Sequence, residues 1–325
     1  MSLKQLKWGI IGAANIAEQQ MIPAILASED GIVTAIASRS GKANEIQKKF
    51  NIPCVTADYD ELFSMDQVDA VYIATPNSTH SELIKKAISA GKHVLCEKPI
   101  VLKKNDLEEI FQLADHHGVY VMEAMMYRFH PQMKACRNLL QSRAIGDVVT
   151  LSLKFHFLLE NWDSDIRTSN QLGGGALNDL GCYCLNAANY LLQSEPQSIQ
   201  ALNSIHRQAE VDTHVSLLLH YETGETMMSD SSFHSPMNNE IEIIGTLGTI
   251  RMPHAFRPDL NDDIGEIYIE KNDIKEKVTF QANPYVEQVN NFQEAIRTES
   301  ELSYSREEMI KQVDLLEKAF VQLSR

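Results

Sequence analysis

Residues 7–17 are KWGIIGAANIA, an apolar strand that runs into a turn of small residues and then into a helix. The turn and the helix start match the dinucleotide fingerprint G-x-G-x-x-G/A, except that Ala14 stands where the second glycine belongs. Gly12 permits the tight turn, small residues let the backbone approach a pyrophosphate, and the amides at a helix N-terminus hold its negative charge. We therefore expect a dinucleotide to bind at Gly12, Ala13, Ala14, Asn15 and Ile16.

The first 124 residues continue the alternation of strand and helix that this segment begins. Further strands are predicted from short apolar runs at residues 32–38, 70–74, 93–96 and 120–123. Helices are predicted between them, from amphipathic stretches at residues 41–50, 79–90 and 105–117. Such alternation is typical of a doubly wound parallel sheet, so residues 1–124 are predicted to form an α/β Rossmann domain.

After residue 125 the pattern changes to strands of alternating apolar and polar residues. These strands are predicted at residues 148–157, 198–202, 211–221, 226–233 and 240–245. Helices are predicted after Pro131 and at residues 176–192, 285–297 and 305–323. The combination indicates an α+β domain over residues 125–325, with a mostly antiparallel sheet and helices on one face.

The composition is that of an ordinary globular protein, and its charge excludes one class of partner. The 325 residues include 29 Lys plus Arg and 44 Asp plus Glu, a net charge of −15, so no basic surface is available for nucleic acid. No apolar run approaches the roughly 18 residues of a membrane-spanning helix, and the N-terminus leads into a strand instead of a signal peptide. We therefore expect a cytoplasmic protein with no membrane partner. The five cysteines are scattered without a C-x-x-C pair, which predicts reduced thiols and no metal site.

The end of the predicted second strand bears on the choice of cofactor. Domains that bind NAD place an acidic residue there for the ribose 2′-hydroxyl. This chain has Ser38-Arg39-Ser40 instead, with Lys42 close behind. A hydroxyl beside a guanidinium suits a 2′-phosphate, because arginine makes charge-assisted hydrogen bonds to it. We therefore predict a preference for NADP(H), with NAD(H) as the alternative if Arg39 is only a solvated loop residue.

Three further segments contain groups suited to catalysis. Residues 75–80 (TPNSTH) and 97–99 (EKP) each follow a predicted strand of the parallel sheet, and ligands of such sheets bind at the carboxyl ends of the strands. Residues 173–183 (GGGALNDLGCY) open the long helix of the second domain. Asp179 and Tyr183 lie four residues apart there, so both side chains are expected on one face of the helix.

In their order along the chain, these motifs resemble those of the glucose-fructose oxidoreductase, inositol dehydrogenase and MocA (Gfo/Idh/MocA) family. The resemblance rests on residues 8–12 (WGIIG), on the three segments above and on residues 123–131 (EAMMYRFHP), and it extends from Trp8 to near the C-terminus. Inositol dehydrogenases have a histidine at the position of Tyr183. Because it has tyrosine there, the chain most resembles the branch of dimeric dihydrodiol dehydrogenases, NADP-dependent xylose dehydrogenases and glucose-fructose oxidoreductase. The resemblance implies an open sheet in the second domain, through which a homodimer or homotetramer forms.

The resemblance also implies that Lys98, Asp179 and Tyr183 surround the nicotinamide. Oxidising a carbinol requires a base within hydrogen-bond reach of the hydroxyl. A free tyrosine is a poor base at neutral pH, and a neighbouring ammonium favours its phenolate. We therefore expect Tyr183 to exchange the proton, Lys98 to favour the phenolate and polarise the reacting oxygen, and Asp179 to orient the substrate or the lysine. Proton exchange by Lys98 itself is the open alternative.

Further binding residues are assigned from the same motifs. The fingerprint residues and the pair Ser38 and Arg39 are already assigned to the cofactor. The further candidates on the cofactor side are Thr75, Pro76, Asn77, His80, Glu97 and Lys98. The candidates on the substrate side have polar groups that suit a polyhydroxylated ligand, and they are Tyr127, Arg128 and Arg167. The structural alternatives are a solvated Lys98, a helix-capping Asp179 and a core Tyr183.

These features predict an NADP-dependent oxidoreductase that transfers a hydride between nicotinamide and a carbinol or carbonyl of a sugar-like or cyclic diol substrate, of the aldose or trans-dihydrodiol dehydrogenase type. One alternative is an NAD-dependent inositol or deoxysugar dehydrogenase, against which Tyr183 and Arg39 count. Another, from a different class, is a non-catalytic protein that senses NADPH. The presence of Lys98, Asp179 and Tyr183 counts against that class, because a sensor needs no groups for proton exchange.

Overall fold

The computed structural model describes residues 5–163, 165–206 and 209–323. The chain divides into unit 1, Met1–Met125 with Tyr285–Ile310, and unit 2, Met126–Pro284 with Lys311–Arg325. The first change of unit falls next to the expected boundary at residue 124. The segment Tyr285–Ile310, however, groups with unit 1, whereas all of residues 125–325 are predicted from the sequence to form the second domain.

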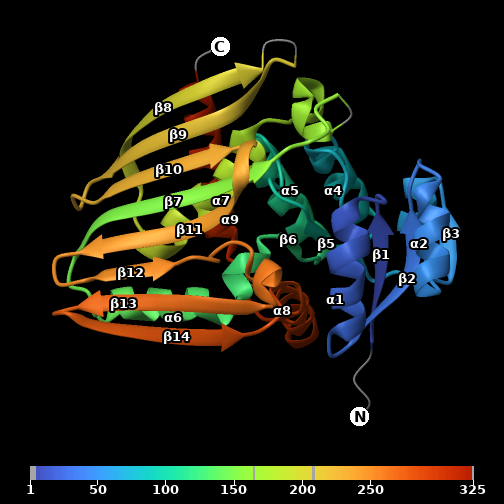
Figure 1. The fold of residues 1–325 in the computed structure, drawn as a ribbon. Helices are drawn as coiled ribbons and strands as arrows, with labels where there is room; N and C mark the ends of the chain where they lie inside the picture. The colour runs from blue at the N-terminus through green and yellow to red at the C-terminus, as the bar shows by residue number, and fades with distance from the viewer. Residues whose placement is uncertain (1–4, 164, 207–208, 324–325) are drawn as a thin grey trace. The chain divides into compact units, whose positions relative to one another are not determined.

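Unit 1 is built on a six-stranded parallel sheet in the order β3-β2-β1-β4-β5-β6 (Figure 1). The strands are β1 (Leu6–Ile11), β2 (Gly31–Ala37), β3 (Cys54–Thr56), β4 (Ala70–Ile73), β5 (His93–Cys96) and β6 (Val121–Glu123). The order reverses between β1 and β4, the position at which doubly wound sheets bind ligands. The predicted Rossmann fold is confirmed. Strand β3 is not predicted from the sequence, because a three-residue edge strand is too short to show a pattern.

Helices connect the strands of unit 1. They are a π-helical turn (Ala17–Met21) continued by α1 (Ile22–Ala27), then α2 (Lys42–Phe50), α3 (Tyr59–Phe63), α4 (His80–Ser89) and α5 (Lys104–His117). A 3₁₀ turn, Asn77–Thr79, leads into α4. Later in the chain, α8 (Pro284–Thr298) and the first turn of α9 (Arg306–Val321) also belong to this unit.

Two contacts explain why this distant segment groups with unit 1. Trp8 of β1 is fully buried, and its ring centroid lies 5.7 Å from that of Phe292 in α8. The buried carboxylate of Glu123 accepts hydrogen bonds from the Tyr304 hydroxyl at 2.8 Å and from the Ile100 amide at 2.9 Å. A buried carboxylate is costly without such partners, so Tyr304 is needed where β6 ends.

Unit 2 contains an eight-stranded sheet in the order β14-β13-β12-β11-β7-β10-β9-β8 (Figure 1). The strands are β7 (Val148–Leu158), β8 (Pro196–His206), β9 (Val211–Tyr221), β10 (Thr226–Ser232), β11 (His234–Gly245), β12 (Thr249–Met252), β13 (Ile264–Lys271) and β14 (Ile274–Gln281). Neighbouring strands are antiparallel except β7 and β10, so the predicted α+β fold with a mostly antiparallel sheet is confirmed. Strands β12, β13 and β14 are not predicted from the sequence. Almost every side chain of β14, an edge strand, is exposed, so its sequence shows no apolar face.

The helices of unit 2 lie on one face of this sheet (Figure 1). They are α6 (Pro131–Gln141), a π-helical turn (Leu177–Gly181) continued by α7 (Cys182–Leu192), and the C-terminal part of α9. Short 3₁₀ turns lie at Met126–Phe129, Ile166–Thr168, Asn170–Leu172 and Pro258–Asn261. The other face of the sheet exposes apolar side chains, among them Leu202, Leu218 and Met228. Within the described ranges no helix is both long enough and apolar enough to cross a bilayer.

Candidate active site

The predicted phosphate-binding turn follows β1 directly. Gly12 adopts a φ of 98°, and its amide donates to the Ala37 carbonyl at 2.8 Å, which joins the turn to the end of β2. A Cβ on Gly12 would lie 2.3 Å from the Ala74 carbonyl oxygen, so this position requires glycine both for its φ and for its closeness to β4. Ala13 and Ala14 follow, and the helix begins at Asn15 and Ile16. The first amides of a helix have no intrahelical partner, so this turn is suited to hold a pyrophosphate.

Two cations and two hydroxyls gather where β2 ends. The Arg39 guanidinium lies over the Tyr59 ring, 5.1 Å from its centroid. The hydroxyls of Ser38 and Ser40 are 3.1 Å apart, with Ser38 buried and Arg39 exposed. Lys42 Nζ donates to Asn15 Oδ1 at 2.6 Å. The end of β2 is thus linked to the helix that follows Gly12, and it presents positive charge there.

Two of these contacts lie outside what the sequence analysis found. Tyr59 begins α3, within the region 51–69 for which no element was predicted, so nothing in the sequence placed its ring under Arg39. The bond of Lys42 to Asn15 spans 27 residues and has no local signal. Lys42 also pairs with Glu18 at 3.1 Å, so part of its charge is neutralised at this position.

His80 joins the loops that follow β4 and β5. It is fully buried, with Nδ1 2.9 Å from the Pro99 carbonyl oxygen and Nε2 2.9 Å from the Thr75 carbonyl oxygen. Burial, and then the charge of Lys98, lower the pKa of His80. The lowered pKa favours the neutral imidazole, which carries one N–H and can donate to one of the two carbonyls at a time. The structure thus places this predicted cofactor residue as a link between the two loops.

The other predicted residues of these loops lie at the same carboxyl ends. The Thr75 hydroxyl is 2.7 Å from that of Thr79, in the turn that contains Pro76 and Asn77. The Glu97 amide donates to the Ile73 carbonyl at 2.9 Å, and its Oε1 accepts from the Tyr72 hydroxyl at 2.5 Å. The Glu97 carboxylate is therefore turned toward the sheet.

Lys98 follows Glu97 and is half-buried. Its amide lies 3.4 Å from Glu97 Oε2, and its positive charge adds to the larger effect of burial in lowering the pKa of His80. The structure therefore brings together Lys98, Glu97, His80 and Thr75 at the ends of β4 and β5, as expected of residues that follow neighbouring parallel strands.

In unit 2, Asp179 forms an ion pair with Arg167. Arg167 Nε donates to Asp179 Oδ2 at 2.8 Å, and its Nη1 donates to Asp165 Oδ1 at 3.2 Å. The same guanidinium lies over the ring of Phe157, 5.5 Å from its centroid. Asp179, and less strongly Asp165, raise the pKa of Arg167. Two residues predicted separately, one catalytic and one for substrate, are thus a single charged pair.

Asp179 lies in a π-helical turn, Leu177–Gly181, where the sequence predicts a regular α-helix. A π turn inserts one residue into an α-helix and is frequent at functional sites. The hydrophobic periodicity of the segment cannot reveal one inserted residue, because Leu177, Leu180 and Leu185 are buried in either geometry.

Tyr183 lies in the first turn of α7, within a cluster of aromatic rings. Its ring centroid is 5.0 Å from Phe155, 5.7 Å from Tyr127 and 5.9 Å from Phe256. The residue is only 8% exposed, so the ring is fixed by packing. This combination suits a group that must meet a substrate in one orientation.

Tyr127 and Arg128, the other predicted substrate residues, direct polar groups toward α7. The Tyr127 hydroxyl donates to Asn186 Oδ1 at 2.7 Å, and Arg128 Nη1 lies 3.3 Å from the same oxygen. Burial raises the pKa of Tyr127 well above its ordinary value. The Arg128 guanidinium also lies 4.6 Å from the ring centroid of Tyr190. These contacts stabilise the position of α7, which contains Tyr183. Contact of Tyr127 and Arg128 with a substrate stays a prediction.

No group of three His, Cys, Asp or Glu side chains suited to a metal ion occurs in the described part of the chain. The five cysteines are free thiols; Cys54 is half-buried, and the other four are buried. The residues assembled in each unit are instead amides, hydroxyls, cations and a carboxylate. Such groups suit an organic ligand with phosphate and hydroxyl groups.

The fold and these groups define a dinucleotide-binding oxidoreductase of two domains, and comparison with known families agrees. A model described as "Oxidoreductase family, NAD-binding Rossmann fold" matches residues 6–125, and a model of the GFO/IDH/MocA C-terminal domain matches residues 133–251. The chain belongs to the GFO/IDH/MocA family of oxidoreductases, as the motifs of the sequence predicted.

Similar proteins act on several kinds of substrate. The chain is 33% identical to a D-xylose 1-dehydrogenase (NADP(+)) of Haloferax volcanii, over 94% of this chain and 93% of that protein. It is 34% identical to trans-1,2-dihydrobenzene-1,2-diol dehydrogenase of Mus musculus, over 78% and 76%. Among solved structures, a 3-ketoreductase of Actinomadura kijaniata in complex with NADP and TDP-benzene superposes with a TM-score of 0.92 at 29% identity, over 98% of each chain.

Proposed function

We propose that this protein is an NADP(H)-dependent oxidoreductase that transfers a hydride between nicotinamide and a carbinol or carbonyl of a sugar-like or cyclic diol substrate. The preference for NADP(H) is argued from the residues at the end of β2. Ser38 and Arg39 stand there in place of an acidic residue, and the Arg39 guanidinium lies over the Tyr59 ring. Relatives named for NADP and for sugar or diol substrates support the same assignment.

The residues of unit 1 fit NADP(H). Gly12 packs against the Ala74 carbonyl, which holds the turn after β1 beside the end of β4, and the amides at the helix start that follows suit a pyrophosphate. In the proposal Ala13, Ala14, Asn15 and Ile16 hold the pyrophosphate, and Ser38 and Arg39 hold the 2′-phosphate. Thr75, Pro76, Asn77, His80, Glu97 and Lys98 form the nicotinamide end. When bound, the cofactor supplies or accepts the hydride.

Proton exchange is assigned to three side chains. The Tyr183 hydroxyl exchanges a proton with the substrate oxygen, and the Lys98 ammonium favours the phenolate and polarises that oxygen. The proposal requires both groups to reach one substrate. Asp179 is held as a carboxylate by Arg167, so it acts as a hydrogen-bond acceptor that orients a substrate hydroxyl. Proton exchange by Lys98 is the alternative.

The substrate class has a second candidate. The chain is 30% identical to dTDP-3,4-didehydro-2,6-dideoxy-alpha-D-glucose 3-reductase of Actinomadura kijaniata, over 96% of this chain and 94% of that protein. This similarity favours a keto-deoxysugar reductase over an inositol dehydrogenase as the alternative to an aldose or diol dehydrogenase. A protein that only senses NADPH is the alternative outside enzymes.

A paired titration with NADPH and NADH, followed by a substrate panel, tests the proposal. We expect NADPH to bind at least about tenfold more tightly, a difference of about 1.4 kcal/mol, and to be oxidised or formed with one class of aldose, diol or keto-deoxysugar. Tighter binding of NADH would return the NAD-dependent alternative to first place. Binding without turnover on the whole panel would favour a sensor.

Two further parts of the proposal concern assembly and location. The sheet face that exposes Leu202, Leu218 and Met228 is assigned to a homodimer or homotetramer, because a patch of this kind is stabilised when a second copy covers it. The free cysteines fit the reducing cytoplasm. Light scattering at micromolar concentration tests the assembly, and a mass of 36.6 kDa would contradict it.

A further inference from the structure

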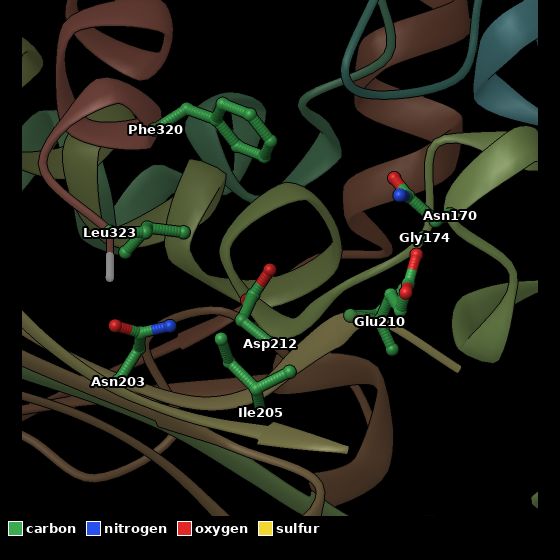
Figure 2. Close-up of a pocket in the computed structure, with 9 residues that line it drawn as sticks. Asn170, Gly174, Asn203, Ile205, Glu210, Asp212, Phe320 and Leu323 are labelled. Atoms are coloured by element: carbon green, nitrogen blue, oxygen red, sulfur yellow. The ribbon is translucent and has the colours of Figure 1, made fainter. Parts of the chain in front are cut away.

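Asp212, which no motif singled out, lies at the start of β9 and is directed at the helix that contains Asp179 and Tyr183. The residue is only 6% exposed. Its Oδ2 accepts a hydrogen bond of 2.6 Å from the amide of Leu177, the first residue of the π turn. Asp212 lines a cavity of about 540 Å³ together with Glu210 and Asn203. Figure 2 shows these side chains around the cavity. A helix start is where a carboxylate interacts favourably with the amides and the helix dipole.

The same carboxylate also contacts the backbone just before the helix. Gly175 has a φ of 107°, and a Cβ there would lie 2.3 Å from Asp212 Oδ1. The Gly175 amide donates to the Arg167 carbonyl at 2.9 Å, and its carbonyl accepts from the Asp179 amide at 3.0 Å. The glycine at this position therefore lets β9, the loop containing Arg167 and the first helical turn approach one another closely.

These contacts fix the turn from two sides. Asp212 holds its first amide from the sheet, and Arg167 holds the Asp179 carboxylate two residues further on. Burial raises the pKa of Asp212, while hydrogen bonds from the amides of Leu177 and Ala176 act in the opposite direction. Burial alone would disfavour the charged carboxylate, and the hydrogen bonds to the helix start offset this cost.

We propose that Asp212 is a positioning residue for the reaction: its bonds to the start of the π turn set the place and rotation of the turn, and hence of Asp179 and Tyr183. This inference rests on the proposed oxidoreductase function. Asp212 acts through the helix, and its effect therefore falls on turnover. Small displacements of a catalytic group, of about 1 Å, cost on the order of a hundredfold in rate.

The test compares Asp212→Asn and Asp212→Ala with a matched control, Glu210→Gln. The control removes the same charge from the wall of the same cavity, two residues away, on an exposed side chain. For each variant we would measure the NADPH dissociation constant, kcat and KM for the best substrate, and amide hydrogen exchange over residues 175–183. The exchange measurement needs no substrate.

We expect the NADPH dissociation constant to stay within about twofold in all variants, because Asp212 belongs to unit 2 and the cofactor residues to unit 1. For Asp212→Ala we expect kcat to fall at least about tenfold, with a smaller change in KM and faster exchange at residues 176–181. Asp212→Asn keeps one acceptor oxygen, so its kcat and its exchange rates should lie between those of Asp212→Ala and those of the unaltered protein. Glu210→Gln should have the kcat, KM and exchange rates of the unaltered protein.

Two results would overturn the proposal. Unchanged exchange in both Asp212 variants would mean that the carboxylate does not hold the turn. Faster exchange with unchanged kcat would mean that it holds the turn only for stability. If Asp212→Ala does not fold, Asp212→Asn and Asp212→Ser, which retain an acceptor, provide the same comparison. Failure of the unaltered protein to turn over any substrate would instead count against the proposed function, and the exchange measurement would still report on Asp212.

Discussion

The guanidinium of Arg167 and the carboxylate of Asp179 form one hydrogen-bonded ion pair, with Nε 2.8 Å from Oδ2. Asp165 Oδ1 accepts a further hydrogen bond, of 3.2 Å, from Nη1 of the same guanidinium. The Asp179 side chain is 15% exposed and that of Arg167 37%, so the pair is partly shielded from water. Asp179 is therefore held in one orientation and in its charged form, which suits a hydrogen-bond acceptor better than a general acid.

This pair predicts strong coupling between two substitutions. Arg167→Ala releases the Asp179 carboxylate, and Asp179→Asn removes its charge, so each alone should lower kcat/KM at least about tenfold, or about 1.4 kcal/mol. The double variant should lose little more than either single variant, because each change already breaks the same interaction. Steady-state kinetics of the four proteins measures this. Additive losses would show that the two residues act independently.

Lys98 is predicted to act in turnover and not in cofactor affinity. Replacing Lys98 by Met removes the ammonium and keeps much of the side-chain volume, so we expect NADPH to bind within about threefold of normal while kcat falls by about 10² to 10⁴, the usual range for proton-transfer groups. Lys85→Met is the control, since Lys85 makes an exposed ion pair with Glu109. Fluorescence titration and steady-state kinetics separate the two effects. Unchanged kcat in Lys98→Met would remove Lys98 from the mechanism.

Arg39, whose guanidinium lies over the Tyr59 ring, is predicted to determine the preference for NADPH over NADH. Arg39→Ala should weaken NADPH binding about tenfold or more with little effect on NADH, because the 2′-phosphate loses its charge-assisted hydrogen bonds. Tyr59→Leu removes the ring 5.1 Å from the guanidinium and should weaken NADPH binding less, by about threefold. Titration with both cofactors measures the ratio. Equal losses for NADPH and NADH would place Arg39 outside phosphate recognition.

The fold and the site residues that lie next to strand ends could be predicted from the sequence because their signals are local. An apolar run followed by Gly12 indicates a strand, a turn and a helix, and parallel strands bring their carboxyl ends together. His80, at the start of α4, therefore lies 2.9 Å from the Pro99 carbonyl after β5, although 19 residues separate them in the sequence. The antiparallel strands 211–221 and 226–232 alternate clearly enough to be predicted as well.

The features that sequence analysis missed depend on contacts between distant residues. Nothing near Asp212 in the sequence shows that its carboxylate meets Leu177, 35 residues earlier. The grouping of Tyr285–Ile310 with unit 1 depends on Trp8 and Glu123, more than 180 residues away. The π turn at Leu177–Gly181 changes one hydrogen-bond register and leaves the hydrophobic pattern intact.

His80 is predicted to make the protein less stable as the pH falls. Burial and the charge of Lys98 lower its pKa below the ordinary 6.5. The unfolded chain therefore takes up a proton near pH 6.5 that the folded protein does not accept until lower pH. The free energy of unfolding falls as the pH decreases from about 6.5 to the folded-state pKa, and then levels off for this residue.

Two measurements check this behaviour. The ¹³C-labelled His80 imidazole, followed by NMR, should titrate at a lower pH than an exposed histidine. Urea unfolding between pH 5 and pH 7 should show a smaller pH slope for His80→Gln than for the unaltered protein. His93 and His130 also have lowered pKa values, so part of the slope should persist in that variant. A His80 titration at or above pH 6.5 would contradict the neutral ring. It would mean instead that the two carbonyls of Thr75 and Pro99 hold an imidazolium that donates to both.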